Sequence, residues 1–175
     1  MAKVIGMAPP KAASRWVSPN GYCLMAVGTH SHVVIGGPFD AFNGGFGVCL
    51  EKHSSKVNEA DILVDWPDSG VINADEFAFL IGRIVEEMLQ HPEVPVYIGC
   101  WGGIGRTGTA FAGLVRALGV DEASPAAWAR ESYLYNAVET GAQKDLIKEF
   151  DVSDVQRLSA RRWKSRFVIP VSLRG

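Results

Sequence analysis

Apolar and polar positions follow two different periods along this chain. Between residues 74 and 90, apolar side chains recur every three or four residues, which is the spacing of one buried face of an α-helix. Asn73 and Glu76 form a suitable capping pair at the start of this segment. The pattern therefore predicts a helix over residues 74–90. Its apolar face would consist of Phe77, Leu80, Ile81, Ile84, Val85, Met88 and Leu89.

Shorter apolar runs elsewhere predict β-strands. Two of them, YCLMAVG (22–28) and HVVIGG (32–37), flank the polar sequence THSH and predict a β-hairpin. The runs DILV (61–64) and VPVYIG (94–99) have the length and composition of short, buried strands in a central sheet. Residues 37–47 are rich in glycine and predict turns.

Capping residues mark further helices. One helix should begin near Thr107 and end at Gly119, because glycine suits the position that follows a helix. Ser124 and Pro125 favour the start of a third helix, with serine as N-cap and proline in the first turn. The N-cap candidates for a fourth and a fifth helix are Thr140 and Ser153.

The order of these elements indicates the fold class. Strands that alternate with helices and then give way to helices are typical of an α/β sandwich. We expect a single domain over residues 21–175, with a central mixed sheet flanked by helices, after an N-terminal arm at residues 1–20. The closing run RFVIPVSL (166–173) predicts an edge strand, because Pro170 cannot donate to a neighbouring strand.

Composition and charge narrow the classes of function. A chain of 175 residues, 47% hydrophobic and 21% charged, is typical of one soluble domain with a real core. Its formal net charge of −2 gives no general attraction to nucleic acid or to an anionic membrane, so neither is expected as a partner. No apolar run is long enough to span a membrane, and the N-terminus has too short an apolar core for a secretory signal.

Cysteine and histidine spacing indicate no metal site. The three cysteines are an odd number at no metal-ligand spacing, which favours a reducing, cytoplasmic setting over a disulfide framework. His30 and His32 would share one face of a strand, but no third ligand is evident. We therefore expect neither a metal nor another cofactor.

The basic sequence RRWKSR (161–166) is typical of a solvated helix end.

The sequence VYIGCWGGIGRTGTAF (96–111) is compatible with three anion-binding loops. Gly103, Gly105 and Gly108 have the G-x-G-x-x-G spacing of a dinucleotide-binding loop. The same residues nearly match the G-x-x-x-x-G-K-[ST] loop of nucleoside triphosphatases, and they also contain the pattern C-x5-R-T. In each case a strand, a glycine-rich turn and a helix would follow one another, and the helix N-terminus would hold the anion.

Two of these three interpretations require residues that the sequence does not have. A dinucleotide loop needs an acidic residue at the end of a second strand, whereas Asp121 and Glu122 lie between two predicted helices. In the triphosphatase pattern, Cys100 replaces the first glycine and Arg106 replaces the lysine. Both interpretations are therefore disfavoured.

The pattern C-x5-R-T accounts for the unusual residues. Cys100 follows the strand, and a loop of this length can curl around a tetrahedral anion with its N–H groups pointing inward. Arg106 offers a planar fork for two phosphate oxygens, and together with the helix dipole it favours a nucleophilic thiolate. Thr107 is placed to donate its hydroxyl to the departing thiolate. The expected phosphate-binding residues are Trp101, Gly102, Gly103, Ile104, Gly105 and Arg106.

A second motif supplies an acid. Breaking a phosphate ester requires a proton for the leaving oxygen. The sequence VDWPDSG (64–70) contains two candidates, of which Asp68 is preferred because Asp65 would still lie at the end of its strand. Ser69 and Gly70 follow as a possible hinge. An ordinary surface turn is the alternative interpretation of this segment.

The two motifs together resemble those of the cysteine-dependent protein tyrosine phosphatase superfamily, and the small size resembles its compact dual-specificity members. The similarity covers roughly residues 20–150. It implies a cysteinyl-phosphate intermediate, with Cys100 as nucleophile, Arg106 as phosphate clamp and Asp68 as general acid and then base. The segment NAVETGAQKDLI resembles the stretch that carries a water-orienting glutamine, which would give this role to Gln143. A capping box with Thr140 is the alternative for this glutamine.

Two departures from the family pattern affect the expected function. Gly99 stands where the family usually has a histidine that orients the cysteine, and no stretch before Asp68 matches the loop that stacks on phosphotyrosine in the large tyrosine-specific members. The phosphate loop also carries no lysines of the kind found in the phosphoinositide branch. We expect a phosphomonoesterase that acts on phosphotyrosine in proteins, with phosphoserine, phosphothreonine and small phosphomonoesters as further substrates. Phosphate, sulfate or vanadate should bind in the loop. The alternatives are a phosphate-binding pseudophosphatase and the same chemistry on a nucleotide, an RNA 5′-phosphate or an inositol phosphate.

Overall fold

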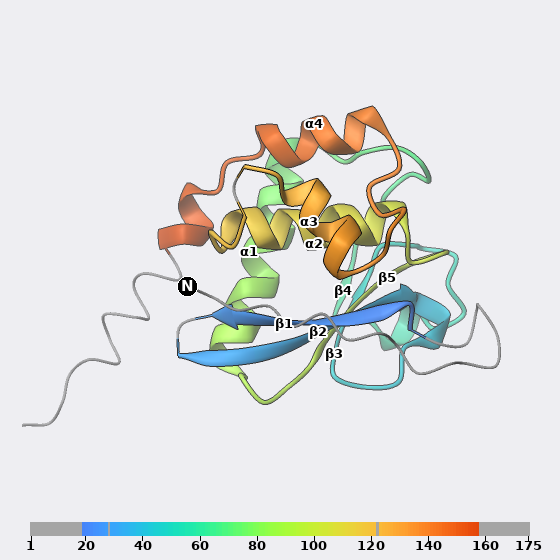
Figure 1. The fold of residues 1–175 in the computed structure, drawn as a ribbon. Coiled ribbons are helices and arrows are strands. Elements are labelled where there is room, and N and C mark those ends of the chain that lie inside the picture. Colours follow the sequence, from blue (N-terminus) through green and yellow to red (C-terminus); the bar gives the residue numbers. More distant parts are fainter. Residues whose placement is uncertain (1–18, 28, 122, 158–175) are drawn as a thin grey trace, which may run out of the picture.

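The computed structural model describes residues 19–27, 29–121 and 123–157. They form a five-stranded mixed sheet with the helices gathered on one side of it (Figure 1). The strands are β1 (Gly21–Val27), β2 (His30–Pro38), β3 (Phe46–Cys49), β4 (Ile62–Leu63) and β5 (Val96–Cys100). The helices are α1 (Ala74–Gln90), α2 (Gly105–Ala117), α3 (Pro125–Ser132) and α4 (Gly141–Glu149), with 3-10 turns η1 (Phe39–Ala41) and η2 (Val57–Glu59).

Some expected features lie outside the described residues. They are the edge strand at 166–173, the basic sequence at 161–166 and most of the arm at 1–20. The helix expected after Ser153 is helical from residue 153 as far as the described chain extends, which is residue 157. Among the described residues, no helix is long and apolar enough to cross a membrane.

Strand β5 lies at the centre of the sheet, whose order is β1-β2-β5-β3-β4. The predicted hairpin is confirmed, because β1 and β2 pair antiparallel from Gly21 opposite Gly36 to Val27 opposite His30. Strand β5 runs parallel to both of its neighbours, β2 and β3. The carboxyl end of this central strand is Cys100, so the topology places the candidate nucleophile at the middle of one sheet edge.

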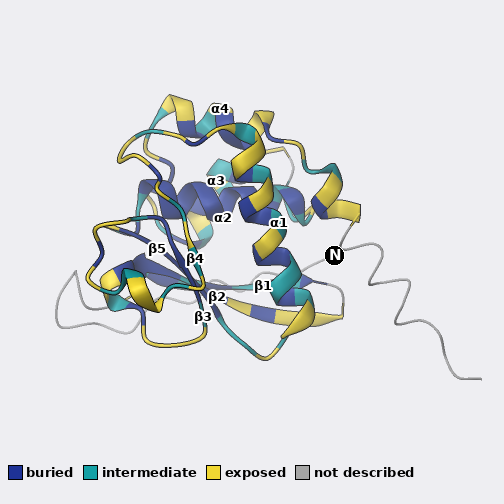
Figure 2. Cartoon of the chain, turned by 180° about the vertical axis from the view of Figure 1, so that it is seen from behind, coloured by how far each residue is buried: buried dark blue, intermediate teal, exposed yellow. Residues whose placement is uncertain are grey.

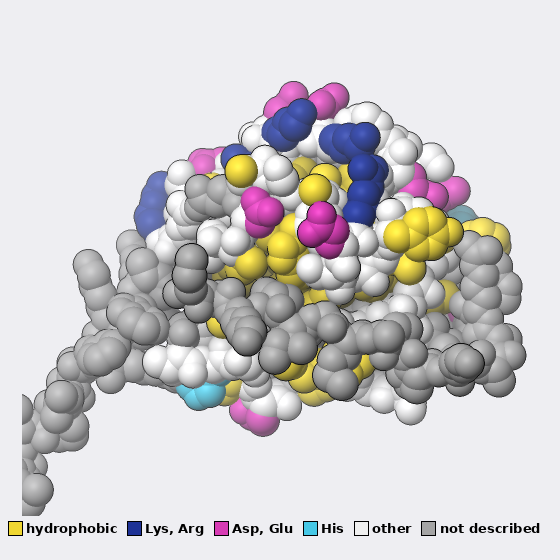
Figure 3. All heavy atoms as spheres, in the orientation of Figure 1, with side chains coloured by type: hydrophobic (Ala, Val, Ile, Leu, Met, Phe, Trp, Pro, Cys, Tyr) yellow, Lys and Arg dark blue, Asp and Glu magenta, His cyan; other side chains and the backbone are white. Residues whose placement is uncertain are grey.

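The core lies between the sheet and the helical layer. Because strand side chains alternate between faces, Val96 and Ile98 face the helices, whereas Tyr97 packs with Phe39 and Phe42 on the opposite face. Figure 2 shows that α2 is buried along most of its length, while α1 and α4 expose their outer surfaces. On the face drawn in Figure 3, basic and acidic side chains are mixed over the helices.

Helix α1 agrees with the sequence pattern over its whole length. It extends from Ala74 to Gln90, and the side chain of Asn73 accepts a hydrogen bond from the Glu76 N–H, as expected of its N-cap. The predicted apolar face is buried except for Leu89, which is half-buried. Helix α4 likewise begins after Thr140, as expected.

Four features of the secondary structure differ from the expectations. Strand β3 was missed, because its four residues follow a glycine-rich turn and gain their order from pairing with β5. Strand β4 is not buried: it is a two-residue edge strand, and Leu63 is 51% exposed. Helix α2 begins at Gly105, two residues before Thr107, and its last residue is Ala117, whereas Gly119 follows the C-cap with a φ of +68°, as expected. Ser124 does precede α3, but its side chain makes no capping hydrogen bond.

Candidate active site

The expected phosphate loop lies between β5 and α2, and it forms the floor of a small pocket of about 190 Å³. Cys100 and Arg106 are each only 3% exposed, yet both line this pocket. Asp68 lines the same pocket from residues 64–70, which we call the acid loop. The structure therefore brings together the three residues on which the predicted chemistry depends. The complete lining is Asp68, Ser69, Cys100, Trp101, Gly102, Ile104, Gly105, Arg106 and Glu139.

The backbone of the loop is fixed from outside the pocket. The Asn20 side-chain amide donates hydrogen bonds to the carbonyl oxygens of Gly102 (2.9 Å) and Gly103 (3.0 Å). The hydroxyl of Tyr133, a buried residue, also donates to the Gly103 carbonyl. Because these carbonyls point outward, the loop can turn its N–H groups toward an anion in the pocket. Asn20 was assigned to the arm and Tyr133 had no signal, so the sequence did not reveal this support.

Gly103 does not itself line the pocket, but its position requires glycine. Its φ is +67°, a left-handed conformation that other residues rarely adopt. A Cβ there would lie 2.3 Å from the carbonyl carbon of Gly37. The loop can therefore pass close to β2 only because residue 103 has no side chain.

The Arg106 guanidinium links the phosphate loop to two other segments. Its Nη1 donates to the carbonyl oxygens of Leu50 (3.0 Å) and Trp66 (2.8 Å). The same nitrogen lies 2.9 Å from Oε2 of Glu51, whose side chain is 11% exposed. On the other side, Nη2 lies 3.1 Å from Oδ1 of Asp68. Glu51 is a site residue that the sequence did not reveal, because it is distant from both motifs.

The acid loop is anchored by Trp66 and leaves Asp68 at the pocket mouth. Trp66 is 2% exposed, packs edge-on against Phe77 and donates from Nε1 to the Gly70 carbonyl (3.0 Å). Asp68, by contrast, has a side chain that is 77% exposed. Ser69 has a φ of +56°, which marks a tight turn directly after the acid. A fixed tryptophan and an exposed carboxylate allow Asp68 to meet a bound molecule from the solvent side.

Thr107 contacts the backbone of the candidate nucleophile. Its side chain is completely buried, and its hydroxyl accepts a hydrogen bond from the Cys100 N–H at 3.0 Å. The hydroxyl is thus held next to the candidate nucleophile, and its own proton is available for a further hydrogen bond.

Close packing of backbone atoms around Gly99 explains why this position carries no histidine. A Cβ on residue 99 would lie 2.8 Å from Cα of Phe39, and 2.9 Å from both the Phe39 nitrogen and the Gly37 carbonyl oxygen. These backbone atoms belong to β2 and η1 and cannot move without disturbing the sheet. No side chain fits at this position, so any orientation of Cys100 must come from other contacts.

Gln143 is in contact with the site but does not line the pocket. Its side chain is completely buried, and Oε1 accepts hydrogen bonds from the N–H groups of Glu139 (2.8 Å) and Thr140 (3.2 Å). The Thr140 hydroxyl accepts from the Gln143 N–H, so the alternative of a capping box is confirmed. The residue whose side chain reaches the pocket from this segment is Glu139, which the sequence did not reveal.

The other two thiols differ from Cys100 in their surroundings. Cys23 and Cys49 lie in the core, and burial raises the pKa of Cys23 to about 12 and that of Cys49 to about 11. Neither lines the pocket. Across residues 19–157, apart from the undescribed positions 28 and 122, no three side chains of histidine, cysteine, aspartate or glutamate are grouped as a metal site would require.

No family model and no curated protein matches the chain, whereas several solved structures share its fold. Tk-PTP in its active form has a TM-score of 0.52 at 20% identity, over 71% of this chain and 90% of that one. PTP-2 phosphatase of Cydia pomonella has a TM-score of 0.51 at 14% identity, over 66% and 83%. PTPMT1 in complex with PI(5)P has a TM-score of 0.50 at 16% identity, over 73% and 93%. The expected phosphatase fold is therefore confirmed.

Proposed function

We propose that this protein is a cysteine-dependent phosphomonoesterase. The observation that carries the proposal is the convergence of Cys100, Arg106 and Asp68 on one pocket from two segments that are separated in the sequence. The first two are buried and the third is exposed, which suits a nucleophile and a clamp beneath the phosphate and an acid above it. The shared fold of the solved phosphatases supports this assignment.

In the first step, the Cys100 thiolate attacks the phosphorus atom of the ester. The Sγ–P bond forms while the P–O bond to the leaving group breaks, and protonated Asp68 gives its proton to the leaving oxygen. Arg106 and the loop N–H groups stabilise the charge on the transferring phosphoryl group, which removes the need for a metal. In this step the phosphate would displace the Asp68 carboxylate from Nη2 of Arg106.

In the second step, water hydrolyses the cysteinyl phosphate. The water oxygen bonds to phosphorus, the S–P bond breaks, and the water proton passes to the Asp68 carboxylate. Thr107 donates its hydroxyl to the sulfur as it leaves. We propose that Glu139 accepts a hydrogen bond from this water, and that Gln143 acts on it indirectly by holding the Glu139 backbone.

Phosphotyrosine in proteins is the substrate class that we favour. The pocket is lined by one guanidinium and the two carboxylates of Asp68 and Glu139, so a substrate with several phosphates would meet repulsion. Trp101, which is 62% exposed at the pocket, offers an aromatic surface to an aryl ester. PTPMT1 was solved with PI(5)P, so an inositol phosphate is the second candidate.

The cysteines are free thiols, in keeping with the cytoplasmic setting that we propose.

The decisive experiment compares the native protein with Cys100→Ser in hydrolysis of p-nitrophenyl phosphate, from about pH 4.5 to about pH 8. Activity that is lost in this variant but kept in Cys23→Ser, a change at a buried thiol outside the pocket, would support the mechanism. Phosphotyrosine peptide, phosphoserine peptide and PI(5)P should then be compared by kcat/KM. Vanadate binding without turnover at any pH would indicate a phosphate receptor and overturn the enzymatic assignment.

A further inference from the structure

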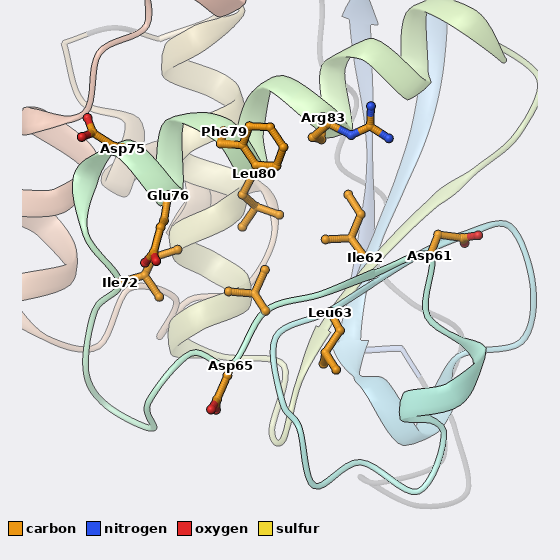
Figure 4. A pocket seen from close by; sticks show the side chains of 11 residues that line it. Asp61, Ile62, Leu63, Asp65, Ile72, Asp75, Glu76, Phe79, Leu80 and Arg83 are labelled. Carbon is orange, nitrogen blue, oxygen red and sulfur yellow. The ribbon is translucent and has the colours of Figure 1, made fainter.

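Beside the acid loop lies a larger hollow that the proposed chemistry does not use. It has a volume of about 700 Å³ and lies between the edge strand β4 and helix α1. Figure 4 shows Ile62 and Leu63 on one side of it and Phe79 and Leu80 on the other. Leu63 is 51% exposed and Phe79 is 71% exposed. Large apolar side chains that face one hollow from exposed positions are typical of an interaction site.

The rim of this hollow is acidic, although the whole chain is nearly neutral. The single cation in the lining, Arg83, is already paired with Glu86 at 2.9 Å. Asp75 and Glu76 form no ion pair with any other described residue. Asp65 pairs with Lys52 at 2.8 Å, so the uncompensated negative charge that an occupant would meet lies mainly at Asp75 and Glu76. The carboxylates of the lining belong to Asp61, Asp65, Asp75 and Glu76.

A second acidic hollow continues the first. It has a volume of about 380 Å³ and shares Asp75, Phe79 and Arg83 with the larger hollow. Its lining adds the carboxylates of Glu86, Asp151 and Asp154 and no further cation, although Glu86 pairs with Arg83 and Asp154 pairs with Arg157. Phe79 thus stands between two acidic depressions. We call the two hollows together the acidic groove.

We propose that the acidic groove docks an extended, basic and apolar segment of the phosphoprotein substrate. Strand β4 pairs only with β3 among the described strands, so its outer edge is open to one more strand. Apolar side chains of the segment would contact Leu63 and Phe79, and its lysine or arginine side chains would reach the carboxylates of the rim. The identity of the occupant as a substrate rests on the proposed function.

Charge excludes the other obvious occupants. Carboxylates on the rim would repel an anionic membrane and nucleic acid, because both carry negative charge at their surfaces. A second copy of this chain would bring the same acidic side chains face to face across a two-fold axis. A cationic segment is the partner that the groove favours.

The groove also lies next to the pocket that would hold the phosphate. Val64 and Asp65 line it and directly precede Trp66, while Ile72 lines it just beyond the far end of the acid loop. A segment in the groove would therefore contact both ends of the loop that carries Asp68. Docking should lower KM for substrates that contain such a segment and leave turnover of small esters unchanged.

The binding test uses the full native chain and a fluorescent ten-residue peptide that alternates lysine or arginine with valine, leucine or phenylalanine and carries no phosphate. We expect saturable binding that Phe79→Ala weakens about tenfold or more. The double change Asp75→Asn with Glu76→Gln should weaken it several-fold, as should added salt. The matched controls, Tyr135→Ala for an exposed aromatic residue and Glu93→Gln with Glu131→Gln for exposed carboxylates, should have no effect. A peptide with glutamate in place of the basic residues should not bind.

The activity test compares two phosphotyrosine peptides, with and without the basic segment. Phe79→Ala should raise KM only for the extended peptide, and p-nitrophenyl phosphate should be hydrolysed as by the native protein. Equal KM values for both peptides with the native protein would overturn substrate docking. Peptide binding in a protein that hydrolyses no phosphate ester would instead overturn the proposed function and leave the groove as a binding site for another partner.

Three other outcomes would also overturn the proposal. The first is that the native chain fails to bind the basic peptide at low salt. The second is binding that appears only after Arg161, Arg162, Lys164 and Arg166 are changed to glutamine, which would indicate that the chain's own basic segment occupies the groove. The third is a dimer that Phe79→Ala dissociates, which would indicate a second copy.

Discussion

The side-chain oxygen of Gln143 lies 2.8 Å from the backbone nitrogen of Glu139, so the glutamine fixes the residue whose carboxylate reaches the phosphate pocket. Two roles were assigned to Gln143 from the sequence, orientation of the hydrolytic water and capping of α4 together with Thr140. Gln143 is buried within a capping box and does not line the pocket, while its Nε2 has no hydrogen-bond partner among the described residues. Glu139 precedes the N-cap of α4 and lines the pocket next to Gly105.

Substitutions at these two positions should therefore have different effects. Glu139→Ala should leave the melting temperature unchanged but slow hydrolysis of the cysteinyl phosphate about tenfold or more, which would appear as a burst of phenolate followed by slow turnover. Gln143→Ala should lower the free energy of unfolding by about 1–3 kcal/mol, because two N–H groups lose their acceptor. Unchanged steady-state turnover in Glu139→Ala would remove this residue from the mechanism.

Asp68→Asn should slow the first step in a way that depends on the leaving group. With phenyl phosphate, whose leaving oxygen needs a proton, we expect a loss of about 10²–10⁴ in kcat. With p-nitrophenyl phosphate the loss should be smaller, because the nitrophenolate leaves without protonation. Asp65→Asn is the matched control, since Asp65 pairs with Lys52 and does not line the pocket. Equal losses with both substrates would argue against Asp68 as the acid.

Introducing a side chain at position 99 should lower the free energy of unfolding rather than improve catalysis. Gly99→Ala would place a Cβ 2.8 Å from the Phe39 backbone, and overpacking of this kind costs about 1–3 kcal/mol. Gly99→His should be worse and is expected to fold poorly. The free energy of unfolding in urea measures both effects. Gly141→Ala is the control, because nothing lies within 4 Å of its added Cβ. A fully stable Gly99→His would contradict the observed packing.

His32 should make the fold sensitive to acid. It is 1% exposed, and neither ring nitrogen has a hydrogen-bond partner among the described residues. Burial lowers its pKa and the neighbouring His30 lowers it further, while the Val27 backbone acts in the opposite direction. The unfolded chain protonates this histidine near pH 6.5, so stability is complete above about that pH and declines as the pH falls below it.

The measurement is the urea midpoint of the native protein and of His32→Leu at about pH 7.5 and about pH 5. His32→Leu should lose part of the difference between the two midpoints. His91→Gln, a change at an exposed histidine paired with Glu87, should retain the difference. An unchanged pH dependence in His32→Leu would show that other groups govern the acid sensitivity.

The elements that the sequence predicted well are those whose signal is local. The period of apolar residues and the Asn73 cap determine α1, and the alternating runs around THSH determine the hairpin. Strand β3 was not predicted, because it is only four residues long, follows a glycine-rich turn and is ordered by pairing with β5. Glu51 was missed for a similar reason: only the path of the chain after β3 brings its carboxylate to Arg106.

The sequence by itself determined the chemistry that this protein can offer: a thiol before a glycine-rich loop, an arginine at the helix entrance and an acid within a tryptophan-proline-aspartate turn. Those residue types and spacings are covalent facts, and their reactivity follows from elementary chemistry. Tertiary structure decided which groups meet. It placed Glu139 rather than Gln143 at the pocket, filled the space beside Gly99 with the Phe39 backbone, and opened the acidic groove between β4 and α1. Such contacts join residues far apart in the chain, and no local pattern records the distance between them.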